Sequence, residues 1–217
     1  MKIKWNGHAS FTITANDGTV IITDPYEPGG FDGAIKYEAI PDKADIAVVS
    51  HEHADHNYVE GLRGDPHPVR NSETVKGIEF KAISVYHDNS KGSERGKNNI
   101  FVFTVDNVRL CHLGDLGHEI DQQVINDIGE VDILFLPIGG TFTIDPNQAA
   151  LPMKQLNPRI VVPMHYKTEK CGFPLAKLDD FIHGKGQAVK NLGAAELEVG
   201  SDSLPESQEI WVLAHSC

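Results

Sequence analysis

The chain has 217 residues, 40% of them hydrophobic and 23% charged, and a formal net charge of −12 at pH 7. This acidity argues against non-specific binding to nucleic acid or anionic lipid, because both need a basic surface. No apolar run approaches the ~20 residues of a transmembrane helix, and the first residues lack the apolar core of a signal peptide. We therefore expect a single cytoplasmic domain over residues 1–217, without a membrane span or a nucleic-acid partner.

Short β-strands are predicted to dominate the first half of the chain. Glycine and aspartate turn signals separate apolar runs, which favours strands at residues 2–5, 10–14, 19–23, 46–50, 78–85, 99–105 and 108–113. Residues 25–41 are expected to form a long loop and residues 57–62 a short helix. Long ordered loops are often functional, which makes the first of these segments of interest.

The second half alternates between helical and extended patterns. We expect helices at residues 121–128, 147–156 and 175–183, strands at residues 131–136, 159–164 and 209–213, and a surface loop at residues 193–206. Strands followed by a βαβα pattern predict an α/β (α+β) fold in which two sheets pack together with helices outside.

The most informative segment is Ser50-His51-Glu52-His53-Ala54-Asp55-His56, directly behind an apolar run. His51 and His53 are two residues apart, so both side chains leave the same face of an extended backbone and can bind one ion. Asp55 and His56 follow where the strand direction is lost, and they can turn to a second ion. Such sets of histidine and carboxylate hold Zn²⁺ and similar ions, and the alternative is a group of solvated loop histidines.

Further ligand candidates stand where later strands end. His87, Asp115 and His165 each follow an apolar strand directly. A lone histidine is more often a satisfied core or surface group, but the first cluster requires partners from elsewhere in the chain. These three positions are therefore the expected partners.

Cysteine usage excludes other kinds of site. Cys111, Cys171 and Cys217 are odd in number and far apart, and they form no CxxC pair. The sequence therefore predicts neither a disulfide framework nor a thiolate metal site, and reduced thiols fit the cytoplasm.

Six motifs along the chain together resemble a known family. They are Gly7-His8-Ala9-Ser10, Thr23-Asp24-Pro25, the segment from Ser50 to His56, Tyr86-His87-Asp88, His112-Leu113-Gly114-Asp115-Leu116-Gly117-His118 and Pro163-Met164-His165-Tyr166. In this order, over about residues 1–170, they resemble the metallo-β-lactamase superfamily. More narrowly, they are similar to its metal-dependent hydrolases near the ascorbate-6-phosphate lactonase and N-acyl-phosphatidylethanolamine phospholipase D groups. The resemblance implies a four-layer αββα sandwich with the metal site at one edge of the two sheets.

The resemblance also assigns metal ligands by matching position. His51, His53 and His87 would hold one divalent ion, Asp55, His56 and His165 a second, and Asp115 would bridge the two. Zn²⁺ is the expected metal, with Mn²⁺ or Fe as alternatives. Asp24 matches an aspartate near the site, which we expect to hold the other nitrogen of a ligand histidine. A turn-forming role before Pro25 is the alternative for Asp24.

Three further histidines are candidates for proton transfer or support. By resemblance His8 lies near the active site, where it could donate a proton or bind substrate. His118 is the freer candidate for proton transfer. His112 alternates with Val108 and Leu110 on one strand face, so support of a ligand and plain core burial both remain open.

A dense cationic stretch closely follows His87. Lys91, Arg95 and Lys97 lie in a glycine-containing segment that could fold over the site, and Arg95 could bind a phosphate or carboxylate with two hydrogen bonds. Lys167 is a further candidate for contact with an anionic substrate. The alternative is a solvated hairpin loop, because surface Lys and Arg are usual.

These features predict a binuclear metal-dependent hydrolase. A metal-bridging hydroxide, with Asp55 and Asp115 as its catalytic ligands, would attack an ester, lactone or phosphodiester, and a small anionic molecule is the expected substrate. His87 lacks the GHTxG context of the lactamases and thioesterases, which argues against their substrates. A non-hydrolytic redox or metal-sensing protein is the alternative, although His53 stands where flavodiiron oxidoreductases carry glutamate. A homo-oligomer is left open.

Overall fold

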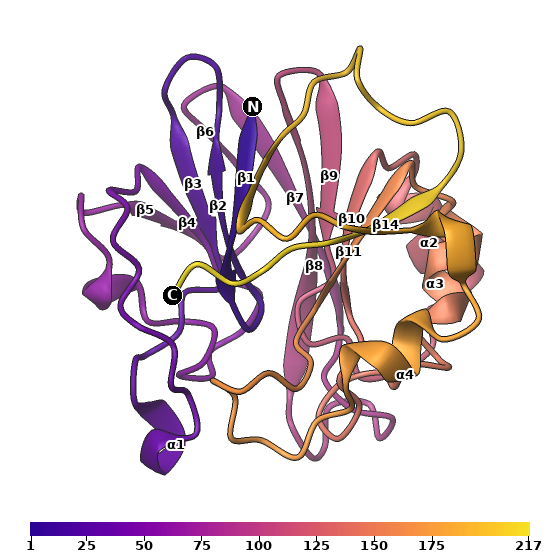
Figure 1. The fold of residues 1–217 in the computed structure, drawn as a ribbon. Helices are drawn as coiled ribbons and strands as arrows, with labels where there is room; N and C mark the ends of the chain where they lie inside the picture. The colour runs from indigo at the N-terminus through magenta and orange to yellow at the C-terminus, as the bar shows by residue number, and fades with distance from the viewer.

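Two β-sheets packed face to face form the centre of the computed structural model, which describes residues 1–217 except the side chain of residue 187 (Figure 1). The six-stranded sheet has the order β13 (Glu196–Glu198), β1 (Lys2–Gly7), β2 (Ser10–Thr14), β3 (Val20–Thr23), β4 (Ile46–Val48), β5 (His67–Val69). The eight-stranded sheet has the order β12 (Val189–Asn191), β14 (Glu209–Val212), β11 (Ile160–Met164), β10 (Ile133–Pro137), β9 (Val108–His112), β8 (Lys97–Val105), β7 (Ile78–Tyr86), β6 (Glu73–Val75).

Strand directions bring the ends of several strands to one edge of each sheet. β1, β2 and β3 pair antiparallel, whereas β4 and β5 continue the sheet in parallel with β3. In the larger sheet β6 to β9 pair antiparallel, and β9, β10, β11, β14 and β12 run parallel. The carboxyl ends of β1, β3 and β4, and those of β7, β9 and β11, therefore point the same way within their sheets.

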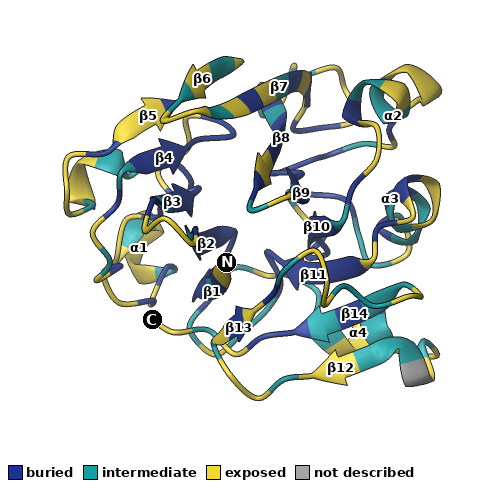
Figure 2. Cartoon of the chain, turned by 90° about the horizontal axis from the view of Figure 1, so that it is seen from above, coloured by how far each residue is buried: buried dark blue, intermediate teal, exposed yellow. Residues whose placement is uncertain are grey.

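Three short helices cover the outer face of the eight-stranded sheet: α2 (Gln122–Ile128), α3 (Ala150–Leu156) and α4 (Leu178–Ile182) (Figures 1 and 2). The side chain of Asp121 accepts a hydrogen bond from Val124 N at the start of α2, and Gly129, with φ 72°, ends this helix. The single turn α1 (Gly30–Gly33) and the 3₁₀ turns η1 (Val59–Gly61) and η2 (Gly186–Ala188) complete the helical elements of the described residues.

The main core lies between the two sheets. Phe11 on β2 and Phe135 on β10 meet there, with ring centroids 4.4 Å apart. Every residue of β10 and β11 is buried, because the other sheet covers one face and helices cover the other. Burial of this continuous apolar interface is the main favourable contribution to folding.

The prediction of two packed sheets with helices outside is confirmed, and the differences are local. The predicted loop 193–206 contains β13, and the predicted helix 57–62 is only the 3₁₀ turn η1. The predicted helix 147–156 begins at Ala150, because Asp145 Oδ1 accepts hydrogen bonds from Asn147 N and Gln148 N and holds the preceding residues in a turn. The predicted helix 175–183 likewise shortens to α4.

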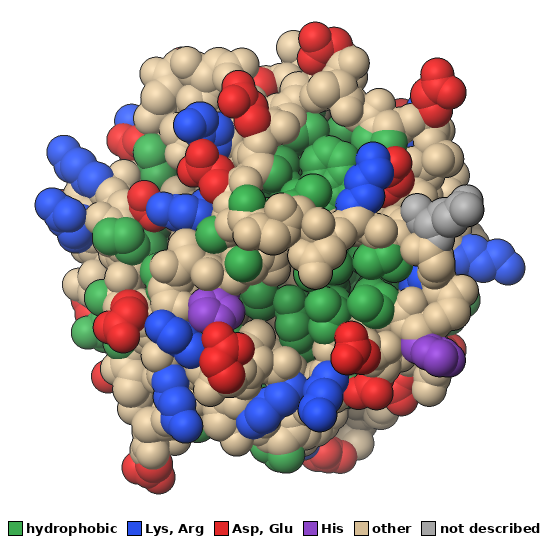
Figure 3. All heavy atoms as spheres, in the orientation of Figure 1, with side chains coloured by type: hydrophobic (Ala, Val, Ile, Leu, Met, Phe, Trp, Pro, Cys, Tyr) green, Lys and Arg blue, Asp and Glu red, His purple; other side chains and the backbone are tan. Residues whose placement is uncertain are grey.

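Among the described residues, the helices are too short or too polar to cross a membrane. On the face shown in Figure 3, acidic and basic side chains alternate around the rim of the molecule. The described part of that face therefore carries charges of both signs and no single acidic patch.

Candidate metal centre

Side chains from both sheets meet at the edge where the strand ends gather. From the six-stranded sheet come His8 in the β1–β2 turn, Asp24 after β3 and the segment from His51 to His56 after β4. From the eight-stranded sheet come His87 after β7, Asp115 after β9 and His165 after β11. Parallel strand direction is the physical reason that residues so far apart in sequence lie together.

Asp115 occupies the middle of this cluster. Its Oδ2 lies 3.3 Å from His56 Nε2, 3.2 Å from His87 Nε2 and 3.3 Å from His165 Nε2. Ligand atoms about 2.0–2.2 Å from a tetrahedral Zn²⁺ are roughly 3.3–3.6 Å from one another. The nitrogen-to-oxygen separations around Asp115 are therefore close to those of a shared ligand shell.

The donor atoms form three overlapping groups. His51, His53 and His87 make up one group, His8, Asp55, His56 and His165 a second, and His51, His56 and Asp115 a third, with the atoms of each group within 4.8 Å of one another. The structure thus brings together all seven side chains that the sequence predicted as ligands. His8 is an additional member of the second group.

Several buried nitrogen and oxygen atoms of the cluster that could bind a metal have no hydrogen-bond partner among the described residues. They include His51 Nε2, His56 Nε2, His165 Nε2 and Asp115 Oδ1. An unpaired buried polar group costs about 1–3 kcal/mol, so four that converge need a common explanation. A cation satisfies them all, because imidazole nitrogens and carboxylate oxygens are its ordinary ligands. The residues present therefore fit a metal site.

Burial and the charges within the cluster together set the protonation states of its side chains. Burial lowers the pKa of His8 to about 4 and that of His51 to about 3, so these imidazoles are neutral near pH 7. Burial alone would raise the pKa of Asp115, but His165 and His56 hold it well below its usual range. Metal binding needs neutral imidazole and ionised carboxylate. Although burial opposes it, Asp115 and Asp55 raise the pKa of His56 well above its usual range, so a cation that binds there would displace a proton from His56.

A buried carboxylate, Asp24, orients the ligands that follow β4. Its oxygens accept hydrogen bonds from Ser50 N and Ser50 Oγ, both at 2.7 Å, and from His56 Nδ1 at 2.9 Å. Because the Ser50 hydroxyl donates to Asp24, its oxygen accepts from His51 Nδ1 at 2.9 Å. These contacts leave Nε2 of both His51 and His56 free to face a cation. The turn-forming alternative for Asp24 does not account for these contacts.

Unlike His8, the predicted support and proton-transfer candidates His112 and His118 lie outside the three groups. His112 is buried, and its Nε2 lies 2.9 Å from Ala9 O while its Nδ1 accepts from Gly114 N. His118 accepts from Tyr86 N through Nε2 and contacts Glu119 O through Nδ1, so backbone groups occupy both nitrogens.

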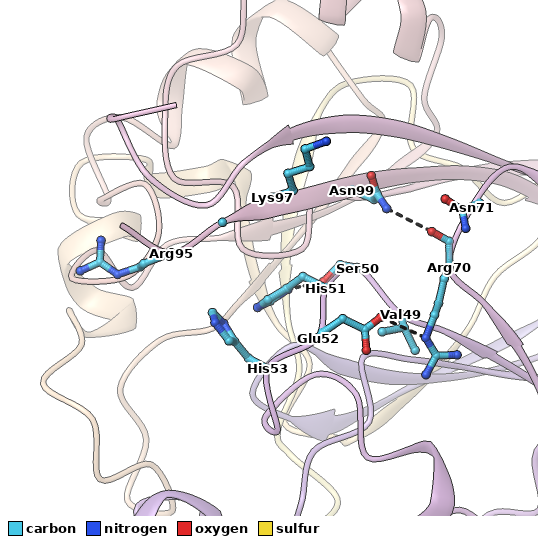
Figure 4. A pocket seen from close by; sticks show the side chains of 11 residues that line it. Val49, Ser50, His51, Glu52, His53, Arg70, Asn71, Arg95, Lys97 and Asn99 are labelled. Atoms are coloured by element: carbon cyan, nitrogen blue, oxygen red, sulfur yellow. Dashed lines mark hydrogen bonds and ion pairs between the residues drawn. The ribbon is translucent and has the colours of Figure 1, made fainter. Parts of the chain in front are cut away.

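The predicted anion contacts separate into two sets. Arg95 and Lys97 line a cavity of about 450 Å³ that also borders His51 and His53 (Figure 4). The ammonium group of Lys167 instead donates to backbone oxygens of Cys171 and Phe173 and does not line this cavity. Lys91 is exposed and also lies outside the cavity lining.

Sequence reasoning assigned no role to two residues that shape this cavity. Arg70, after β5, lines it and is held by Glu52 Oε1 at 3.1 Å and Asn57 Oδ1 at 2.6 Å. Asp88 accepts four backbone N–H groups of residues 90–95, which holds the cationic loop. Although burial opposes it, these donors lower the pKa of Asp88 to about 2. The sequence signal for this role is an aspartate at the start of a segment that contains Gly92 and Gly96, because aspartate side chains commonly accept hydrogen bonds from backbone N–H groups in turns.

Comparisons with known proteins agree with the fold. Residues 2–165 match the family model of the β-lactamase superfamily domain. A UPF0173 metal-dependent hydrolase of Methanoculleus marisnigri is 32% identical over 193 residues, which cover 77% of this chain and 82% of that protein. A second UPF0173 metal-dependent hydrolase, from Bacillus cereus strain B4264, is 30% identical over 212 residues, which cover 83% of this chain and 90% of that protein.

Solved structures show the same architecture. A crystal structure of a metallo-β-lactamase superfamily member from Thermotoga maritima matches with a TM-score of 0.78 and 34% identity. The match covers 98% of this chain and 97% of that protein's chain. A structure from Parabacteroides distasonis, with a TM-score of 0.60 and 23% identity over 85% of this chain and 89% of its own, shares the fold. The chain therefore belongs to the β-lactamase superfamily, among its UPF0173 metal-dependent hydrolases.

Proposed function

We propose that this hydrolase uses two divalent cations to cleave an ester, lactone or phosphodiester bond in a small anionic substrate. The observation that carries the proposal is the position of Asp115, whose Oδ2 lies 3.2–3.3 Å from nitrogens of His56, His87 and His165. His87 belongs to one predicted site and the other two histidines to the second. A single carboxylate oxygen between both sets supports a bridge between two cations.

The charge of the donor set also supports hydrolysis. Two divalent cations held by neutral imidazoles and only two carboxylates, Asp55 and Asp115, leave a net positive charge. Such a site favours the anionic transition state of acyl or phosphoryl transfer. When bound, the cations polarise a substrate oxygen and lower the pKa of a water molecule. Zn²⁺ is our first choice because histidine and carboxylate are its ordinary ligands, with Mn²⁺ or Fe as alternatives.

The chain itself supplies substrate contact. Arg70, Arg95 and Lys97 line the cavity beside His51 and His53, and Glu52, which pairs with Arg70, is the one carboxylate among the described residues of its lining. The lining is therefore positively charged, in a protein whose net charge is −12. The planar guanidinium group matches carboxylate and phosphate geometry with two parallel hydrogen bonds. We propose that this cavity receives the anionic group of the substrate.

The test combines metal content with a substrate panel. We expect two equivalents of Zn²⁺ per chain, and hydrolysis of a chromogenic phosphodiester or lactone that disappears on chelation and returns with Zn²⁺ or Mn²⁺. Thioester and β-lactam substrates serve as comparisons. Asp115→Asn should lose the second equivalent and the activity together. Full retention of both equivalents in this variant would refute the bridge.

A further inference from the structure

His8 reaches the second group of donor atoms from the tight turn between β1 and β2. Its imidazole is fully buried, and its ring centroid lies 4.0 Å from that of His165. Its Nε2 lies 3.0 Å from Asp55 Oδ2. His8 is also absent from the lining of the cavity beside His51. The ring therefore faces the cluster and not the space that a substrate would enter.

The backbone at His8 is held in a conformation that residues other than glycine rarely adopt. His8 has φ 52°, in the left-handed region, which is strained for a residue with a side chain and persists only where surrounding contacts enforce it. Its carbonyl oxygen accepts from Trp5 Nε1 at 3.1 Å and from His165 N at 3.0 Å. At Gly7 a Cβ atom would lie 2.4 Å from the ring of Tyr37, so only glycine fits there. The fold thus retains a strained turn that points this ring at Asp55.

The hydrogen bond has one chemically reasonable direction. An ionised carboxylate only accepts, so His8 Nε2 carries the hydrogen and donates it to Asp55 Oδ2. The same Oδ2 lies 3.6 Å from His56 Nε2, within the ligand-to-ligand spacing described for Asp115. The oxygen that His8 holds is therefore the oxygen that faces the second group. His8 Nδ1 has no hydrogen-bond partner among the described residues, so Nε2 makes the one side-chain hydrogen bond of this ring.

We propose that His8 is a positioning residue that fixes the Asp55 carboxylate by an Nε2–H to Oδ2 hydrogen bond and so completes the second cation site. The inference rests on the proposed two-cation function. It replaces the roles in proton donation and substrate binding that the sequence suggested for His8, because the buried ring does not line the cavity.

The test measures metal affinity in variants at position 8. His8→Asn removes the ring while tolerating the left-handed backbone, and the amide of His8→Gln can still donate from a similar position. His67→Asn is the control, since His67 is 52% exposed and bonded to Glu73 on the surface. Each protein is loaded with Zn²⁺ and titrated with a competing chelator. A denaturant unfolding curve of the metal-free protein verifies that each variant folds.

We expect wild type and His67→Asn to hold two equivalents. In His8→Asn the second equivalent should weaken by about 10–100-fold while the first is unchanged, as for other residues that orient a ligand. His8→Gln should recover most of this loss, which distinguishes a hydrogen-bonding role from direct ligation.

Each contrary result has a distinct meaning. A single equivalent in wild type overturns the two-cation proposal and this inference with it. Two equivalents of unchanged affinity in His8→Asn overturn the inference alone. Loss in His8→Asn without recovery in His8→Gln also overturns it, because the ring then acts as a ligand. If His8→Asn does not fold, His8→Gln decides: near wild-type affinity supports the hydrogen bond, and loss of the second equivalent overturns it.

Discussion

At the scale of single residues, one buried carboxylate organises histidines of both predicted sites. Asp24 bonds His56 directly and reaches His51 through the Ser50 hydroxyl. It has φ 38°, so its backbone is held in the left-handed region, as at His8. Backbone strain at both positions marks where the fold gives up stability to orient the cluster.

Asp24→Ala should therefore weaken binding at both sites. Loss of an acceptor that orients ligand histidines typically costs about 10–100-fold in metal affinity. Competitive chelator titration of Zn²⁺ measures the change, with Asp17→Ala, in an exposed turn, as the matched control. Equal affinities in the two variants would show that Asp24 has no part in orienting the ligands.

Arg95 provides the second test at this scale. If it contacts the anionic group before and during the reaction, Arg95→Ala should raise KM roughly tenfold or more with little change in kcat, because about 1.5–3 kcal/mol of charged hydrogen bonding is lost. Lys91→Ala, on the same loop but outside the cavity lining, should raise KM less. Steady-state kinetics at low ionic strength makes the comparison, and an equal or larger effect at Lys91 would contradict it.

At the scale of elements, close approach of backbone segments sets where the ligands lie. Gly139 lies just after β10, the strand beside β11 in the sheet. A Cβ atom at Gly139 would come within 2.1 Å of His165 O. Gly117 packs in the same way against the backbone of His87. Both contacts are with main-chain atoms, which cannot rotate away as a side chain can.

Gly139→Ala should accordingly displace His165. We expect a loss of about 1–3 kcal/mol in the free energy of unfolding, as for overpacking elsewhere, together with weaker Zn²⁺ binding. Gly30→Ala is the matched control, because its nearest neighbour would lie 3.5 Å away. Denaturant unfolding and chelator titration report the two effects, and unchanged values in Gly139→Ala would exclude this packing role.

At the scale of the whole molecule, the sequence predicted which residues lie at strand ends better than it predicted which side chains contact one another. The seven ligand candidates were identifiable because the carboxyl ends of like-directed strands meet at one edge. Arg70 was missed because β5 has only three residues, with one buried apolar position, Val69. The sequence also did not reveal that the ammonium group of Lys167 donates to backbone oxygens of Cys171 and Phe173, because residue type does not show what surrounds a side chain.

The cysteines allow a test of the whole fold. Cys111, Cys171 and Cys217 are free and buried, and burial raises the pKa of the Cys111 and Cys171 thiols. Because the thiolate is the reactive form, a disulfide reagent should react slowly with the native protein and with three equivalents after unfolding in guanidinium chloride. Rapid reaction of one equivalent in the native state would show that part of this packing opens.

Because one sheet delivers the segment from His51 to His56 and the other delivers His87, Asp115 and His165, no isolated half of the molecule possesses the complete centre. Bound cations would clamp the two sheets across their shared edge. A ligand at a hundred times its Kd stabilises the native state by about 2.7 kcal/mol, so the concentration of free metal in the surroundings would set how far the folding equilibrium favours the joined sheets.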